Sequence, residues 1–320
     1  MKYIEMLREG ENIREIYLCK QRTSATTKNG KQYDNVILQD KTGVLDGKIW
    51  DPTSMGIDDF EALDYVEVTG RVTVFNGSIQ LNIDRARKAN EGEYNQADYL
   101  PMSENNLEDM YREVLKYISG IENDSLKKLL SLIFVEDKEF AKAFMSHSAA
   151  KSVHHGYIGG LAEHTLSVAK LCDFYCVQYP ILNRDLLIAA ALCHDIGKVY
   201  ELSDFPMNDY TDEGQLLGHI VMGAEMVGEK VSEIPDFPKK LANELKHCIL
   251  AHHGELEFGS PKKPALVEAV ALNFADNTDA KMETIKELFE ANQSKKDEWL
   301  GFNRLLDSNI RRTSEGNTNV

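Results

Sequence analysis

Five segments between residues 12 and 88 are rich in β-branched and aromatic residues, and two of them alternate between polar and apolar positions. This pattern, with a period of two, predicts β-strands. The predicted strands are Ile13–Lys20, Tyr33–Gln39, Val44–Trp50, Tyr65–Phe75 and Ser78–Asp84. Asn29-Gly30 and Asn76-Gly77 stand between strands and are typical of tight hairpin turns. The segment Ser54–Leu63, between the third and fourth strands, is expected to be helical.

Five strands with a helical insert after the third favour a small Greek-key barrel of the OB type. Another five-stranded barrel or a small sandwich fits the same strands. If Val36, Leu38, Leu45 and Ile49 point inward, the residues between them face outward on strands two and three. On an OB barrel this face holds single strands of nucleic acid by stacking and by contacts to the backbone.

The candidate nucleic-acid contacts on this face and its neighbouring loops are Lys28, Lys31, Tyr33, Lys48, Trp50 and Asn76. An alternative is that Tyr33 and Trp50 pack against a second domain.

The remainder of the chain has helical patterning. A polar stretch at 90–101 lacks apolar periodicity and is interpreted as a linker. Short helices are expected at Leu107–Ile118, Leu126–Phe134 and Asp137–Met145. The predicted organisation is an OB-fold domain at 1–90, a linker with bridging helices at 91–148, an all-α domain at 149–312 and a disordered tail at 313–320. The predicted class is therefore a multidomain α and β protein.

Five apolar helices in the all-α domain each carry histidine or aspartate. They are predicted at Gly160–Gln178, Arg184–Asp195, Gly214–Lys230, Lys239–His253 and Ala265–Met282. The candidate metal ligands recur every 24 to 33 residues and are His164, His194, Asp195, His219, His252, His253 and Asp276. The helix that ends in His194-Asp195 is apolar almost all round, so we expect it at the centre of the domain. Burying that pair is costly unless a partner such as a metal ion is present.

Histidine and carboxylate ligands suit Mn²⁺, Fe²⁺, Co²⁺ or Zn²⁺. A lone histidine on a helix is more often structural, but five coordinated placements favour a metal site. Six or seven ligands are too many for one tetrahedral ion, so the pattern predicts a two-metal centre. Two such ions a few ångströms apart assist in-line displacement at phosphorus, which makes phosphoester hydrolysis the leading hypothesis.

Composition limits how a phosphate polymer can bind. Thirty-six basic and 52 acidic residues give a net charge of −16, an unfavourable field for nucleic acid. Residues 1–90, with 13 basic and 14 acidic side chains, are almost neutral. We therefore expect nucleic acid to bind at the barrel rather than at the acidic remainder of the chain. Five scattered cysteines form no disulfide framework, and the longest apolar run, Leu186–Cys193, is eight residues. A cytoplasmic protein without a membrane segment is expected.

The motif His164 … His194-Asp195-Ile-Gly-Lys198 … Asp276 resembles the HD superfamily of metal-dependent phosphohydrolases, which are all-helical enzymes. The additional His219 and His252-His253 are similar to its binuclear members. The segment from His154 to Thr165, together with an N-terminal OB-fold, resembles the YhaM family of bacterial 3′-to-5′ exoribonucleases. No Gly-Tyr-Pro follows the paired histidines, which argues against the cyclic-di-GMP phosphodiesterases of the superfamily.

The resemblance implies a role for each matching residue. One ion would be held by His164, His194, Asp195 and Asp276, with Asp195 bridging to a second ion on His219 and either His252 or His253. The other histidine of that pair, with His253 as the candidate, would contact the phosphate or protonate the leaving oxygen. Lys198 would neutralise phosphate charge. His154 and His155 would line the substrate channel or cap the entry of the helix; His147 and His247 receive no role.

The implied activity is Mn²⁺-dependent hydrolysis of single-stranded RNA from its 3′ end, releasing nucleoside monophosphates. Single-stranded DNA as a second substrate and homo-oligomerisation stay open. One alternative is a phosphohydrolase or phosphodiesterase for small nucleotides, which would not need a strand-holding barrel. Another is a non-catalytic RNA-binding protein with a structural metal site.

Overall fold

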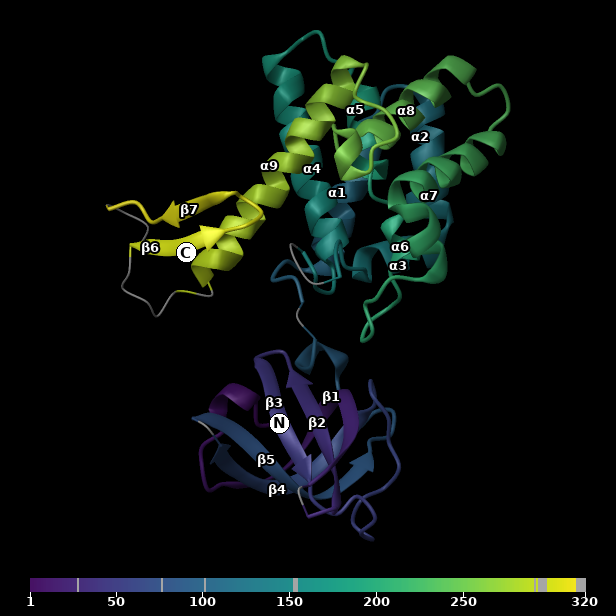
Figure 1. The fold of residues 1–320 in the computed structure, drawn as a ribbon. Helices are drawn as coiled ribbons and strands as arrows, with labels where there is room; N and C mark the ends of the chain where they lie inside the picture. The colour runs from purple at the N-terminus through teal and green to yellow at the C-terminus, as the bar shows by residue number, and fades with distance from the viewer. Residues whose placement is uncertain are drawn as a thin grey trace. The chain divides into compact units, whose positions relative to one another are not determined.

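The structure is a computed structural model that describes residues 1–27, 29–75, 77–100, 102–151, 155–290, 292 and 298–314 of the chain. The chain divides into two compact units, Met1–Met102 and Ser103–Val320 (Figure 1). The predictions made for Lys28, Asn76, His154 and residues 315–320 of the tail lie outside the described residues.

The first unit is a closed five-stranded barrel of the OB type. Its strands are β1 (Asn12–Thr26), β2 (Gln32–Asp40), β3 (Gly43–Ile49), β4 (Tyr65–Phe75) and β5 (Ser78–Lys88). They close in the order β1-β2-β3-β5-β4, with β3 and β5 parallel and every other pair antiparallel. Val36, Leu38, Leu45 and Ile49 are at most 2% exposed and fill the barrel. The predicted OB-type barrel and the inward orientation of these four residues are confirmed.

Two local predictions for the barrel need correction. The first strand was predicted to end at Lys20 but continues to Thr26, because residues 21–26 also pair with β2. The helix predicted at Ser54–Leu63 is wrong: the segment consists of turns around a β-bridge from Ile57 to Ala86. The backbone of this segment hydrogen-bonds to β5: Asp58 N–H donates to Ala86 O, and Ala86 N–H donates to Gly56 O. Short 3₁₀ turns, Ile4–Met6 and Gln96–Asp98, flank the barrel in sequence.

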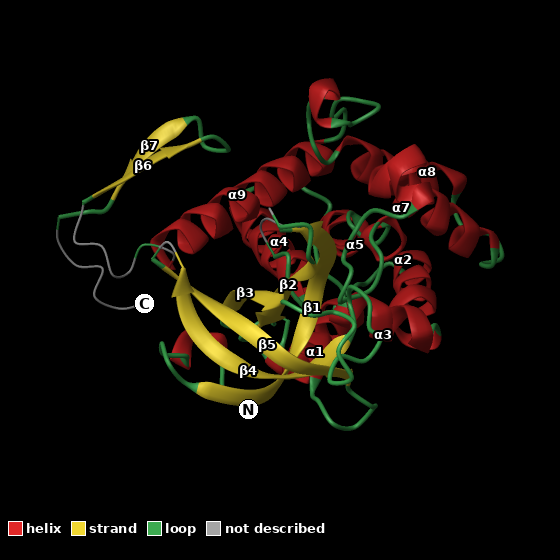
Figure 2. Ribbon diagram, turned by 60° about the horizontal axis from the view of Figure 1, so that its bottom comes forward, coloured by secondary structure: helices red, strands yellow, loops and turns green. Residues whose placement is uncertain are grey.

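The second unit is helical. Its helices are α1 (Leu107–Ser119), α2 (Asp124–Ser131), α3 (Lys138–Ser146), α4 (Gly160–Gln178), α5 (Arg184–Cys193), α6 (Lys198–Glu201), α7 (Asp212–Ser232), α8 (Lys239–Ala251) and α9 (Val267–Glu290), with a π-helical turn at Leu132–Glu136 and a 3₁₀ turn at Leu256–Phe258. Helix α5 packs against α2, α4, α8 and α9 (Figures 1 and 2). Every residue from Leu186 to Cys193 is at most 3% exposed, so α5 is the buried centre that its sequence predicts.

Polar side chains begin these helices in the expected way. Asn106, Asn123 and Asn183 each accept a hydrogen bond from a backbone N–H in the first turn of the helix that follows. Asp137 and Thr211 do the same for α3 and α7. No helix in the described ranges is long and apolar enough to cross a membrane.

A two-stranded hairpin that the sequence did not predict follows α9. It consists of β6 (Trp299–Asn303) and β7 (Ser308–Arg311) (Figure 1). The guanidinium of Arg312 donates to Asn292 O at 2.6 Å and lies 5.8 Å from the ring centroid of Phe289 on α9. These contacts fasten the base of the hairpin to the end of α9.

Candidate metal centre

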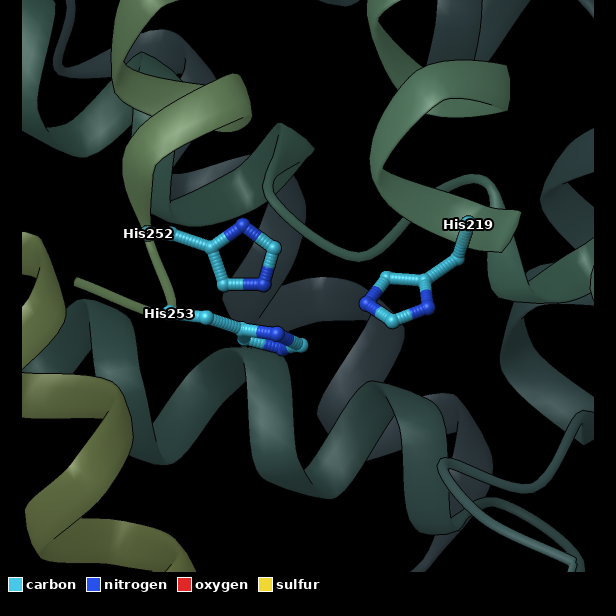
Figure 3. A group of neighbouring side chains, drawn as sticks. All are labelled: His219, His252 and His253. Carbon is cyan, nitrogen blue, oxygen red and sulfur yellow. The ribbon is translucent and has the colours of Figure 1, made fainter. Parts of the chain in front are cut away.

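Five helices bring the seven candidate ligands to one place. The ligand atoms of His164, His194 and Asp276 lie within 4.8 Å of one another, and we call these residues the first cluster. Those of His219, His252 and His253 also lie within 4.8 Å of one another and form the second cluster (Figure 3). Segments separated by more than 100 residues therefore converge as a two-metal centre requires.

Asp195 stands between the clusters and faces both. Its Oδ2 lies 3.4 Å from Nε2 of His164 and 3.4 Å from Nε2 of His194. Its Oδ1 lies 3.5 Å from Nε2 of His219 and 3.6 Å from Nε2 of His252. One carboxylate thus offers one oxygen to each cluster, the arrangement of a bridging ligand.

Backbone carbonyls orient three of the imidazoles. Nδ1 of His194 donates to Ala191 O, Nδ1 of His252 to Ile249 O and Nδ1 of His253 to Phe258 O, each at 2.7 Å. A carbonyl can only accept, so the proton of each neutral ring is on Nδ1. The lone pair on Nε2 is then free for a cation, as in most histidine ligands of metals.

Carboxylates orient the other two imidazoles. Nδ1 of His164 lies 2.7 Å from Asp279 Oδ2, and Nδ1 of His219 lies 2.9 Å from Glu201 Oε1. Asp279 Oδ2 also accepts a hydrogen bond from Nε2 of His155 at 3.0 Å. Sequence reasoning missed both acids. Asp279 could have been found, because it follows Asp276 by three residues on the same helix face, whereas Glu201 reaches His219 only through the packing of α6 on α7.

Burial and charge act in opposite directions on the first cluster. Burial alone would lower the pKa of His164, but hydrogen bonds with Asp195, Asp276 and Asp279 raise it well above 6.5. Burial likewise opposes ionisation of Asp276, yet the neighbouring His164 holds the pKa of that carboxyl below its usual value. His194 has a lowered pKa because burial outweighs its acidic neighbours.

The second cluster is dominated by burial. Burial lowers the pKa of His252 well below 6.5, and the adjacent His253 lowers it further. The pKa of His253 is lowered mainly for the same reason. These two rings are therefore neutral at neutral pH and available as ligands.

The donors fit a divalent cation. Asp195 Oδ1 and His219 Nε2 are buried, face the centre and have no hydrogen-bond partner among the described residues. Nε2 of His164 and Nε2 of His194 lie 3.1 Å apart. When both rings are neutral, these two nitrogens are acceptors and need a cation between them. A nitrogen and carboxylate donor set of this kind suits Mn²⁺, Fe²⁺, Co²⁺ or Zn²⁺.

A glycine sets how closely the elements approach at the centre. A Cβ atom at Gly197 would overlap the carbonyl oxygen of His219 and lie 2.8 Å from Gly223 N. Helix α7 also kinks at Gly218, where φ is +73°. The kink directs the N–H of His219 to Glu201 Oε1 at 3.0 Å.

Lys198 and His155 lie beside the clusters. Lys198 Nζ is 2.7 Å from Asp195 Oδ2, and this contact raises the pKa of the lysine although burial opposes it. His155 is 2% exposed, and its Nδ1 lies 2.9 Å from the hydroxyl of Tyr157. Both ring nitrogens of His155 are engaged, and one of them holds Asp279. Its predicted place in the substrate channel or at the helix entry stays a prediction.

A cavity of about 490 Å³ opens onto the centre. Its lining includes His155, His164, Lys198, His253 and Asp276. His253 of the adjacent histidine pair thus faces the cavity, whereas His252 is buried.

The candidate contacts on the barrel form a small aromatic platform. The rings of Tyr33 and Trp50 stack with centroids 5.2 Å apart, and Trp50 is exposed. Trp50 Nε1 donates to Asn82 Oδ1 at 2.9 Å, and Lys48 is hydrogen-bonded to Asn35. Lys31, the residue directly before β2, is exposed.

The fold and this centre define the chain as an OB-type barrel followed by a helical HD domain. Residues 161–281 match the HD domain family. The chain is 37% identical over 284 residues to the 3′-5′ exoribonuclease YhaM of Geobacillus sp. (strain WCH70), covering 88% of this chain and 86% of that protein. The chain belongs to the YhaM family.

Two solved structures are similar to the separate domains. The second OB-fold domain of replication protein A from Methanococcus maripaludis is 19% identical, with a TM-score of 0.22, and covers 29% of this chain and 98% of that one. The HD domain of the L. monocytogenes phosphodiesterase PgpH is 18% identical, with a TM-score of 0.31, and covers 49% of this chain and 86% of that one.

Proposed function

We propose that this chain is a metal-dependent 3′-to-5′ exoribonuclease that hydrolyses single-stranded RNA to nucleoside monophosphates. The observation that carries the proposal is the convergence of five imidazole groups and the carboxylate of Asp276 around Asp195 in a member of the YhaM family. The OB-type barrel supports a polymeric substrate, because a mononucleotide needs no strand-holding module.

Two divalent ions, with Mn²⁺ as the expected metal, would occupy the centre. His164, His194, Asp195 and Asp276 would hold one. His219 and His252 would hold the other together with Asp195. His252 is preferred to His253 because its Nε2 lies 3.6 Å from Asp195 Oδ1 while His253 lines the cavity. When bound, such ions polarise phosphoryl oxygens and lower the pKa of water.

Lys198 and His253 would contact the substrate and the attacking water. Lys198 stays protonated and balances charge at Asp195, from where it can contact a phosphate oxygen. Because Nδ1 of His253 donates to Phe258 O and its pKa is lowered, Nε2 of the neutral ring is an acceptor. That state suits taking a proton from the attacking water better than protonating the leaving oxygen.

The direct test is incubation of the protein with a 20-residue RNA labelled at its 5′ or its 3′ end. With Mn²⁺, we expect a 5′-labelled ladder that shortens from the 3′ end and immediate release of a 3′-labelled mononucleotide. Treatment with EDTA should stop the reaction, and Mn²⁺ should restore it. Turnover of small nucleotides with the 20-mer left intact would instead establish the small-nucleotide phosphohydrolase.

The barrel would hold the upstream part of the strand and raise the local concentration of its 3′ end. Trp50→Ala should weaken single-strand binding about tenfold, since stacking of one base contributes about 1–3 kcal/mol. Trp50→Phe keeps an aromatic face and is the matched control. Unchanged affinity in Trp50→Ala would remove the stacking role of this residue.

Further parts of the proposal concern DNA, assembly and location. Single-stranded DNA in the same assay tests a second substrate, and sedimentation tests homo-oligomerisation. All five cysteines are free and four are buried, which supports a reducing cytoplasmic location.

A further inference from the structure

The cavity at the metal centre has two large apolar side chains in its lining. Phe258 is 63% exposed and Leu305 is 57% exposed. They come from separate segments, the 3₁₀ turn after α8 and the turn between β6 and β7. A ligand that covers these two side chains would remove apolar surface from water, which favours binding.

Phe258 is held next to the second cluster by its own backbone. Its carbonyl accepts the hydrogen bond from His253 Nδ1, so the position of this residue and that of the imidazole are tied together. Gly259, with φ of +92°, ends the turn directly afterwards. The ring of Phe258 is free to meet a ligand, because the hydrogen bond uses only the main chain.

Leu305 is held by the hairpin. Asn303 Oδ1 accepts hydrogen bonds from the N–H groups of Leu305 and Leu306, at 2.9 and 3.2 Å, and so fixes the turn. The contacts of Arg312 with Asn292 and Phe289 fasten the hairpin to α9, the helix that carries Asp276. The hairpin thus brings an apolar side chain to the cavity.

We propose that Phe258 and Leu305 form a binding subsite for the 3′-terminal nucleobase of the substrate, a proposal that rests on the exoribonuclease function. The bond to be cut by such an enzyme is one nucleotide from the end of the strand, so the terminal base must lie beside the metal cluster. The cavity is large enough for one nucleotide.

The subsite has no sequence preference. Every base has a flat π-face that can lie on an aromatic ring, and neither Phe258 nor Leu305 offers a side-chain donor or acceptor to read a base edge. An enzyme that removes nucleotides successively requires this tolerance.

The test pairs a change in the protein with a change in the RNA. One 20-mer ends in a normal nucleotide, and a second ends in an abasic residue with the same phosphodiester. In the unmodified protein the abasic end should raise KM about tenfold or more. Phe258→Ala, which keeps the carbonyl that orients His253, should raise KM for the normal RNA by a similar factor and give no further rise for the abasic one.

Three further variants sharpen the result. Phe258→Trp should retain the low KM, and Leu305→Ala should raise KM in the same base-dependent way. Phe174→Ala removes a similarly exposed ring from α4 and should change nothing. The subsite is overturned if the unmodified protein treats both RNAs alike, or if Phe258→Ala affects both equally. Failure of the unmodified protein to shorten the normal RNA is the separate result that overturns the exoribonuclease function itself.

Discussion

The two clusters that face Asp195 are supported by different groups. In the first cluster, negative charge is concentrated: Asp276 is a member, and Asp279 stands behind His164. The second cluster consists of three imidazoles, two of them fixed by backbone carbonyls and one by Glu201. A cluster that contains one carboxylate and is supported by another, and a cluster of three imidazoles, therefore both face the single carboxylate of Asp195.

The difference indicates how the two positions would behave towards cations. A divalent ion in the first cluster meets more negative charge and is expected to bind more tightly. An ion in the second cluster would have Asp195 as its one carboxylate ligand among the candidate residues. We expect the first position to fill first and the second to respond more to free metal concentration.

The largest effect should come from removing the acid that the clusters share. Asp195→Ala should lower kcat on labelled RNA by roughly 1,000-fold or more, because stabilisation of several kcal/mol is lost at both positions. Elemental analysis should find both metal positions weakened, while single-strand binding by the barrel is retained. Glu213→Ala, an exposed acid at the start of α7, is the control. Full nuclease activity in metal-free Asp195→Ala protein would contradict the two-metal assignment.

Removal of one histidine from each cluster separates the two positions. His219→Ala should leave the first ion in place, remove the second and reduce kcat roughly 100-fold, a change of about 3 kcal/mol. His194→Ala should lower the affinity of the first cluster for its ion, which we expect to be the more tightly bound one. Metal content measured at several Mn²⁺ concentrations distinguishes the variants, and identical binding curves would mean that the clusters are not independent positions.

The acids behind the imidazoles should have smaller effects. Asp279→Asn should weaken metal binding in the first cluster about 10- to 100-fold, since partners that orient a ligand commonly have effects of that size. Glu201→Gln should act on the second cluster and by a smaller factor, because the carboxylate of Glu201 contacts one imidazole, that of His219, whereas Asp279 contacts both His164 and His155. Isothermal titration of the metal-free proteins with Mn²⁺ measures the metal affinity of both variants. A larger loss of affinity in Glu201→Gln than in Asp279→Asn would contradict the proposed order.

The smallest expected difference between the two clusters is in how their metal affinity depends on pH. The raised pKa of His164 means that it carries a proton at neutral pH, and a cation must displace that proton. Affinity at the first cluster should therefore rise with pH until the pKa of His164 is passed, by at most about tenfold per unit. His252 and His253, with lowered pKa values, are already neutral, so the second cluster should respond less. Calorimetry at two pH values checks this, and equal slopes would contradict it.

The sequence predicted those parts of the molecule where local pattern and final environment agree. Strand Tyr65–Phe75 and helix Gly160–Gln178 were predicted with the bounds that the structure has. Helix α5 was predicted as the buried centre because its apolar run leaves no polar face. The candidate ligands were recognisable because histidine and aspartate are unusual at the edge of such helices.

The errors arose where tertiary contacts decide. Ser54–Leu63 is held by hydrogen bonds to β5, which no local pattern contains. Glu201 and Phe258 are ordinary residues in sequence and acquire their positions from the packing of neighbouring segments. The contact of His155 with Asp279 was likewise not predictable, because the two residues are 124 positions apart in the sequence.

The close approach at Gly197 has a consequence for variation in this molecule. One missing methyl group fixes how far the chain after α5 stands from α7, and hence how closely Asp195 approaches His219. Gly197→Ala would leave every candidate ligand present and still move them apart. A comparison of the candidate ligands alone would judge such a variant intact, although the backbone of His219 would have to move away from residue 197.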